Sequence, residues 1–106
     1  MATTPEYVSY VCDQIRSTGA VRFKKMFGEY MVYIDDKPIL LVCDNTVFVK
    51  QLDCVEALLA GAPLGAPYAG AKEHYILDID DERLSCDVVR AMLPAVPVPK
   101  PRKKKA

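Results

Sequence analysis

The sequence has few of the residues from which metal sites and catalytic centres are most often built. Its 106 residues include a single histidine, four cysteines and no tryptophan. No two cysteines form a CxxC pair, so the sequence predicts neither a zinc site nor a disulfide framework, and we expect no cofactor. Each cysteine falls at an apolar position of a periodic segment, which predicts small buried thiols. The four are Cys12, Cys43, Cys54 and Cys86.

Long apolar stretches are also absent from the sequence. No run approaches the ~20 residues that span a bilayer, and residues 1–5 lack the basic and then apolar pattern of a signal peptide. We therefore expect a cytoplasmic protein that makes no contact with membranes. A chain of this length is expected to form one domain, which buries roughly 60 to 70% of the surface that the unfolded chain exposes.

The charged residues balance in number but are unevenly distributed. All 14 acidic residues and nine of the 14 lysines and arginines lie within residues 1–99, so this part of the chain is acidic. From Pro94 onward the chain alternates proline with small or basic residues, a pattern typical of extended, disordered segments. We predict a folded domain over residues 1–93 and a disordered Pro/Lys-rich tail over residues 94–106. The tail cations are Lys100, Arg102, Lys103, Lys104 and Lys105.

The spacing of apolar residues predicts three helices. The first begins with Thr4 as its N-cap and Pro5 as its first helical residue, and Gly19 follows it as a stop. Asp53 is expected to cap the second, and the acidic residues 80–82 precede or begin the third, where the helix dipole favours anions. The expected buried faces are Val8, Val11, Cys12 and Ile15; Cys54, Val55, Leu58 and Leu59; and Leu84, Val88, Ala91 and Met92.

Alternating and continuous apolar segments predict about five strands. Turn residues at 35–38 and 44–45 join the first four into an antiparallel meander, and residues 39–43 are apolar on both faces, as in a strand covered on both sides. The Gly/Pro-rich residues 61–71 predict a loop. The fold class is therefore α+β, a small antiparallel sheet packed with helices in the order α-β-β-β-β-α-β-α. The strands are expected near residues 21–25, 30–34, 39–43, 46–50 and 74–79.

Gly28 lies between two strand-like runs and is the glycine for which the sequence most strongly indicates a special backbone. Lys25 breaks the alternation just before it, which predicts a β-bulge. If the constraint is conformational, Gly28→Val should destabilise the fold by about 1 to 3 kcal/mol. If the glycine instead admits a ligand or a partner chain, the substitution should remove binding and leave stability nearly unchanged.

His74 is the one histidine that could serve as a general acid or base. No motif places a cysteine at a helix-start or strand-end elbow, and none places an Asp or Asn to orient the imidazole. We therefore interpret His74 as a strand-edge residue without a catalytic role and expect no enzymatic activity. An enzyme built on a reactive thiol remains as an alternative.

Three cations stand beside aromatic residues near the start of the predicted sheet. Arg22, Lys24 and Lys25, together with neighbouring rings, resemble the cations and stacking platforms that bind nucleic acids. The competing interpretation places the rings in the core and the lysines on a solvated face. The acidic domain favours this second interpretation because it would repel phosphates. The aromatic residues are Phe23, Phe27, Tyr30 and Tyr33.

One segment resembles a known protein family. Residues 25–30 read Lys-Met-Phe-Gly-Glu-Tyr, and a tyrosine, an acidic turn and a strand ending in Val-Lys follow. This pattern is similar to the N-terminal domain of the TfoX/Sxy family of competence regulators, and the similarity extends from about Tyr7 to Leu93. The residues that carry it are Lys25, Met26, Phe27, Gly28, Tyr30, Tyr33 and Lys50.

The resemblance implies a fold related to the secretion-chaperone-like dimers and no enzymatic activity. The chain departs from the family pattern at Glu29 and Asp36, where glycines are usual, and it lacks the helical C-terminal domain of the full-length regulators. We hypothesise a bacterial regulatory or interaction module of the TfoX/Sxy type, linked to transcription or competence regulation through protein contacts. We expect a homodimer, because the edges of an antiparallel sheet must be covered, and an unidentified protein partner. The alternative is a weak, sequence-independent nucleic-acid binder that acts through the basic tail.

Overall fold

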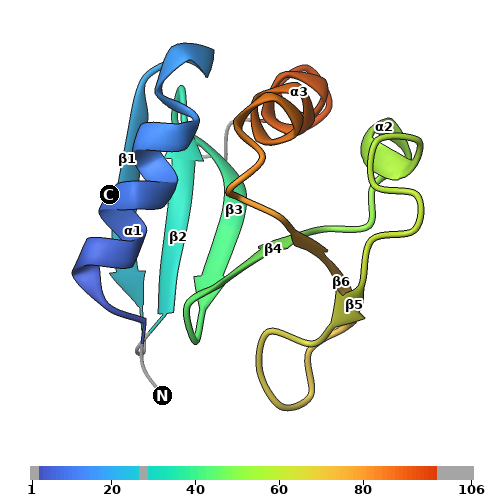
Figure 1. Ribbon diagram of the computed structural model, residues 1–106, viewed down its shortest axis with the longest axis horizontal. Helices are drawn as coiled ribbons and strands as arrows, with labels where there is room; N and C mark the ends of the chain where they lie inside the picture. The colour runs from blue at the N-terminus through green and yellow to red at the C-terminus, as the bar shows by residue number, and fades with distance from the viewer. Residues whose placement is uncertain (1–2, 27–28, 98–106) are drawn as a thin grey trace, which may run out of the picture.

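The computed structural model describes residues 3–26 and 29–97. Over these residues a six-stranded antiparallel sheet packs against helices (Figure 1), which confirms the predicted α+β fold class. No helix in this part of the chain is long and apolar enough to cross a membrane. The helices are α1 (Pro5–Gln14), the 3₁₀ turn η1 (Arg16–Thr18), α2 (Asp53–Glu56) and α3 (Glu82–Met92). The strands are β1 (Val21–Met26), β2 (Glu29–Ile34), β3 (Lys37–Cys43), β4 (Thr46–Val49), β5 (Leu64–Gly65) and β6 (His74–Leu77).

The first four strands form the predicted meander. The strand order is β1-β2-β3-β4-β6-β5, so each strand pairs with the next up to β4, and β6 then joins the sheet beside β4. β5 forms the far edge, where Leu64 pairs with Tyr75 and Gly65 pairs with His74. The prediction of a loop over residues 61–71 is therefore wrong at these two residues, because a two-residue strand is too short to show an alternating pattern.

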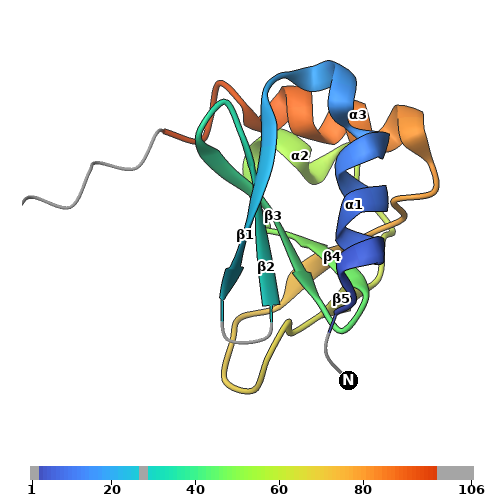
Figure 2. The same ribbon diagram turned by 90° about the vertical axis from the view of Figure 1, so that its left-hand side faces the viewer.

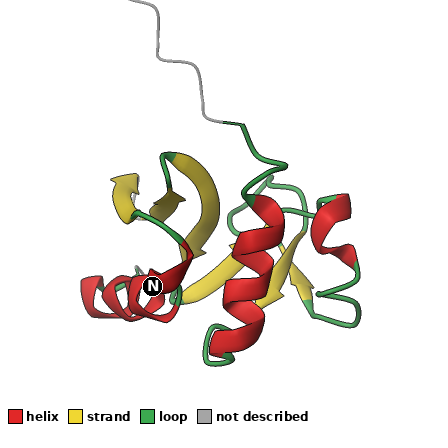
Figure 3. Cartoon of the chain, turned by 90° about the horizontal axis from the view of Figure 1, so that it is seen from above, coloured by secondary structure: helices red, strands yellow, loops and turns green. Residues whose placement is uncertain are grey.

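The helices lie on one face of the sheet, as Figures 2 and 3 show from two directions. The side chains that β2 and β3 direct toward the helices are completely buried and form the centre of the core. The predicted faces of α1 and α3 pack against them, with Leu84 and Ala91 at the margin. The core includes Val8, Val11 and Ile15 of α1, Val32 and Ile34 of β2, Leu40 and Val42 of β3, and Val88, Val89 and Met92 of α3.

The start of α1 agrees with the prediction. The Tyr7 amide donates a hydrogen bond of 3.2 Å to the Thr4 hydroxyl oxygen, and Pro5 occupies the first turn. The first-turn amides of a helix have no partner within it. The Thr4 hydroxyl accepts a hydrogen bond from one of them, and Pro5 has no amide hydrogen that would need a partner. The helix ends at Gln14, earlier than predicted, because η1 forms a separate turn before Gly19.

Both predicted hairpin turns have a left-handed backbone. The φ angles are 52° at Asp35 and 68° at Asp36, and 52° at Asp44 and 54° at Asn45. Positive φ at both central residues is characteristic of the type I′ turn, whose twist matches that of the flanking strands. Aspartate and asparagine adopt this conformation more readily than most residues do, which explains their presence here.

The bulge predicted at Lys25 is not present. β1 and β2 pair in one unbroken register along all six residues of β1. The register shifts instead between β2 and β3 at Val32/Tyr33, where Tyr33 pairs with Pro38. Proline has no N–H to donate to the ladder, so pairing is irregular where it occurs. Gly28 lies outside the described residues, and its special backbone remains a prediction.

Helix α2 is shorter than predicted, and Asp53 does not cap it. The N-cap position belongs to Leu52, which makes no side-chain capping bond, so Asp53 is the first helical residue. Val55 and Leu59 are buried as predicted, whereas Leu58 is 38% exposed. Because the helix ends after four residues, its periodicity does not extend to Leu58.

The packed chain continues beyond the boundary predicted at residue 93. The amides of Ala95 and Val96 donate hydrogen bonds of 2.9 and 2.8 Å to the Met92 carbonyl, and Val96 packs against the core. The Lys37 ammonium group donates a hydrogen bond to the Leu93 carbonyl, which ties the end of α3 to the start of β3. Ala95 and Val96, assigned to the tail from the sequence, therefore make contacts with the end of α3, and Val96 also packs against the core.

Candidate binding pocket

The face of the sheet opposite the helices carries a row of apolar side chains. Met31 pairs with Leu41, Leu41 with Phe48, and Phe48 with Ile76, so four neighbouring strands each contribute one residue to the row. Phe48 is only 7% exposed, and the other three are partly buried. We call this set of four residues the open-face row. Within the described residues no helix covers it (Figure 2), although the apolar character of residues 39–43 predicted a strand covered on both faces.

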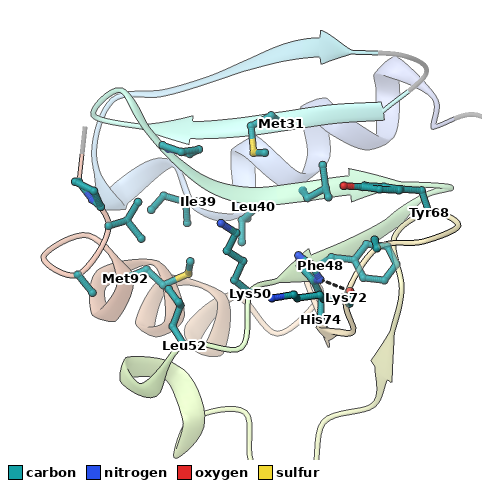
Figure 4. Close-up of a pocket in the computed structure, with 16 residues that line it drawn as sticks. Met31, Ile39, Leu40, Phe48, Lys50, Leu52, Tyr68, Lys72, His74 and Met92 are labelled. Carbon is teal, nitrogen blue, oxygen red and sulfur yellow. Dashed lines mark hydrogen bonds between the residues drawn. The ribbon is translucent and has the colours of Figure 1, made fainter. Parts of the chain in front are cut away.

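A pocket opens where β3 and β4 separate. Their pairing ends at Leu41 and Phe48, whereas β3 continues along β2 as far as Lys37 and β4 continues along β6 as far as Val49. The diverging strands leave a cavity of about 500 Å³ between them (Figure 4). Small-molecule sites typically measure roughly 300 to 1,000 Å³. The divergence of two hydrogen-bonded ladders therefore creates a cavity of ligand size.

Segments that are far apart in the sequence enclose this pocket. Leu40 of β3 and Met92 of α3, both core residues, line its deep part. Residues 95–97 line one side, held near β3 by the bond between Lys37 and Leu93. On the opposite side Tyr68 projects from the loop before β6 with its hydroxyl group directed into the pocket (Figure 4).

Two lysines and one histidine contribute basic side chains to the pocket. Lys50, Lys72 and His74 contribute to the lining, and none of the described lining residues is an Asp or Glu. A carbonyl oxygen can only accept a hydrogen bond, so His74 donates from Nδ1 to the Lys72 carbonyl at 2.8 Å and leaves Nε2 for another partner. The His74 ring also meets Phe48 edge to face at 6.4 Å. The result is an apolar chamber with cationic groups at one side.

A second hollow of about 520 Å³ adjoins these cations. It shares Lys50, Leu52, Lys72 and His74 with the first pocket and adds one acidic residue, Glu73. The side-chain amide of Gln51 donates a hydrogen bond of 2.8 Å to the Glu73 carbonyl, which joins the end of β4 to the segment before β6. The basic groups therefore stand on a connected rim between the two hollows.

The basic cluster predicted near the start of the sheet lies on β1 and does not line the pocket. The Arg22 guanidinium lies 4.5 Å from the centroid of the Tyr33 ring and donates a hydrogen bond of 3.2 Å to Asp36. Lys24 and Lys25 are exposed. The structure thus places two lysines and one engaged arginine on this strand, while the tail cations lie outside the described residues.

The residues of the TfoX/Sxy-like motif occupy several different environments. Lys25 pairs with Tyr30 across the first hairpin, and the buried Tyr30 ring contacts the edge of Phe23, which is 43% exposed. Met26 ends β1. Of the described motif residues only Lys50 lines the pocket. Phe27 and Gly28 lie outside the described residues.

Sequence reasoning identified two pocket residues, His74 and Lys50, but not the pocket itself. The missed groups include Lys72 and Tyr68, which a Gly/Pro-rich loop carries to the sheet. The signal that could have indicated the site is the apolar character of residues 39–43 on both faces, which required a cover that the predicted helices did not supply.

The thiols of Cys43 and Cys12 are held neutral rather than activated. Burial raises the pKa of Cys43 to about 12, and the carboxylates of Glu29 and Asp44 act in the same direction. Burial likewise raises the pKa of Cys12 to about 11. Reactive thiols have a lowered pKa, so these two residues give no support to a thiol enzyme. Cys43 and Cys86 are buried as predicted, whereas Cys12 and Cys54 are partly buried. Within the described residues, no group of three or more His, Cys, Asp or Glu is arranged to hold a metal ion.

A protein of Spirochaeta aurantia, described as an uncharacterised 12.7 kDa protein in the trpE 5′ region, is 36% identical to this chain over 107 residues. The alignment covers 99% of the chain and 93% of the Spirochaeta protein. No protein-family model matches the chain, and no solved structure matches it. The resemblance to the TfoX/Sxy family therefore remains a prediction.

Proposed function

The chain belongs to the same family as the uncharacterised Spirochaeta aurantia protein, and we propose that it is a non-enzymatic interaction module of the regulatory TfoX/Sxy type. In this proposal it contacts a partner protein through the open-face row, and a second copy of the chain is the first partner to test. The supporting observation is that Met31, Leu41, Phe48 and Ile76 form an apolar row on the side of the sheet without helices. Met31, Leu41 and Ile76 are partly exposed, and apolar side chains that remain accessible on one face often mark an interaction site.

The edges of the sheet are less suited to a contact than its open face. β5 offers only two residues for pairing, and β1 presents the exposed Lys24 and Lys25. Very short strands and charged edge residues, especially lysine, oppose pairing between sheet edges. The dimer hypothesis started from the need to protect the sheet edges, and the short β5 and the lysines of β1 already do this. The open face of the sheet is therefore the favoured contact surface.

Leu41→Glu tests this proposal with Leu58→Glu as its control. Leu41 stands inside the open-face row, where a carboxylate would have to be buried without a partner on association. Leu58 is an exposed leucine after α2, on the helical side, so the control changes the charge equally. We expect the wild type and Leu58→Glu to sediment at micromolar concentration as dimers of the 11.8 kDa chain, and Leu41→Glu as a monomer.

The heterologous partner requires a second measurement. Affinity capture from the native cell with each of the three proteins should retain a shared set of proteins on wild type and Leu58→Glu and lose it on Leu41→Glu. A wild type that stays monomeric and captures the same proteins as Leu41→Glu would contradict the proposal.

A further inference from the structure

We propose that the pocket between β3 and β4 binds a small amphipathic anion, an alkyl or aryl carboxylate of medium chain length. The proposal goes beyond the interaction module. Because Met31, Leu41 and Phe48 belong both to the open-face row and to the pocket lining, a ligand and a protein partner would compete for these residues. The proposal follows from three properties of the pocket: its volume, its apolar interior and the sign of the charge at its rim.

The interior of the pocket fits an apolar body. Leu40, Leu52 and Met92 line it toward the core, and Met31, Leu41 and Phe48 line it on the sheet face. These side chains offer no hydrogen-bond partners to a polar ligand, so a sugar or a free inorganic anion would lose its hydration without compensation. An alkyl or aryl group would instead gain free energy by leaving water for this apolar interior.

The rim supplies the complement to a single anionic group. Lys50, Lys72 and His74 come from the end of β4 and the start of β6, and Figure 4 shows the Lys72 amine directed toward the Lys50 side chain. The Tyr68 hydroxyl, which can donate a hydrogen bond, points into the same space. This charge is a local reversal, because residues 1–99 contain 14 acidic side chains and nine lysines and arginines. An apolar cavity with a few polar groups at its rim is the usual composition of a site that orients an amphipathic ligand.

The charge of the rim also distinguishes between candidate occupants. Residues 98–106 of the chain carry five cations and would be repelled by Lys50 and Lys72. A nucleic acid would satisfy the lysines but would leave the deep apolar part unfilled. A small carboxylate with an apolar body uses both parts of the pocket.

Isothermal titration calorimetry with decanoate tests this assignment on the full chain. We expect saturable binding at one site and no binding of nonyltrimethylammonium, which has the same nine-carbon alkyl chain and the opposite charge. The double variant Lys50→Glu/Lys72→Glu should raise the Kd for decanoate at least tenfold. Arg83→Glu reverses an exposed charge on α3, outside the pocket lining, and should leave the Kd within about twofold.

A second pair of variants tests the cavity rather than its charge. Ala71→Phe places a ring in the pocket lining and should abolish decanoate binding, while Ala66→Phe adds the same ring at an exposed position of the same loop and should not. Circular dichroism would establish that all variants are folded. Equal binding of the cationic analogue, equal weakening by Arg83→Glu, or unchanged binding by Ala71→Phe would each overturn the proposal. A protein that sediments with phosphatidylglycerol vesicles but does not bind decanoate would also overturn the proposal, in favour of a lipid surface.

Discussion

Gly19 occupies a position where a side chain would collide with the end of β2 and the turn that follows it. A Cβ there would lie 2.9 Å from Asp35 Oδ1 and 2.9 Å from Ile34 Cγ2. Asp35 has little freedom to withdraw, because its Oδ1 accepts a hydrogen bond of 2.9 Å from the Ala20 amide. Gly19→Ala should therefore destabilise the fold by about 1 to 3 kcal/mol, measured by urea unfolding.

Gly65→Ala provides the comparison for Gly19→Ala. The nearest atom to its added Cβ would be Ile76 Cδ1 at 3.2 Å, the flexible end of a side chain that can move. We expect a smaller loss of stability than for Gly19→Ala. Equal midpoint shifts for the two variants would show that the Asp35 contact is not the constraint.

Cys43 gives a pH dependence whose sign follows from burial. The thiol has a reference pKa of 9.0, and burial raises its pKa in the folded protein to about 12. Between these values the unfolded chain loses the proton and the folded chain retains it, so stability is complete below pH 9 and declines as the pH approaches 12. The urea concentration at the unfolding midpoint should therefore be lower at about pH 11 than at about pH 8, and this difference should be smaller in Cys43→Ala. An unchanged slope in Cys43→Ala would assign the effect to other groups.

At the scale of elements, Thr4 stabilises the start of α1 as its N-cap. Thr4→Ala removes the oxygen that accepts the Tyr7 amide and should lower the free energy of unfolding by about 1 kcal/mol. Ser9→Ala changes an exposed hydroxyl within the same helix and serves as the control. Thermal unfolding of the two variants should show a lower midpoint for Thr4→Ala alone. Coincident curves would mean that the cap contributes little to folding.

The elements that sequence reasoning predicted well are those specified by local chemistry. The meander followed from apolar alternation and from turn residues such as Asp44 and Asn45, which adopt the left-handed backbone by themselves. The bulge was misplaced because its cause, Pro38, acts on the pairing with the neighbouring strand rather than on its own segment. β5 escaped prediction because its two residues are a strand only by virtue of β6 beside them.

The pocket could not be predicted from the sequence for a related reason. It exists because the ladder between β3 and β4 stops at Leu41 and Phe48 while each strand continues with its other neighbour. The length of a ladder depends on the twist and packing of the whole sheet, and local periodicity does not report it. Lys72 and Tyr68 reach the pocket through a loop whose path the sequence pattern does not specify.

For the whole molecule, the arrangement of charge separates three regions. The folded part is acidic in total, the pocket rim is basic, and residues 98–106 are basic. Long-range attraction of an anionic macromolecule would therefore depend on the tail, because the folded part repels phosphates. This separation makes the nucleic-acid alternative testable independently of the pocket.

Deletion of residues 100–106 tests the nucleic-acid alternative. If all five tail cations contacted phosphates of duplex DNA, log K against log salt concentration would have a slope of at most about −4.5. We expect any binding, measured by fluorescence anisotropy across a salt series, to disappear on deletion. Lys24→Glu/Lys25→Glu should change it little, because Arg22 beside them already pairs with Asp36. Binding that survives the deletion and is lost in the β1 variant would transfer the contact to β1, and a slope near zero would exclude phosphate contacts altogether.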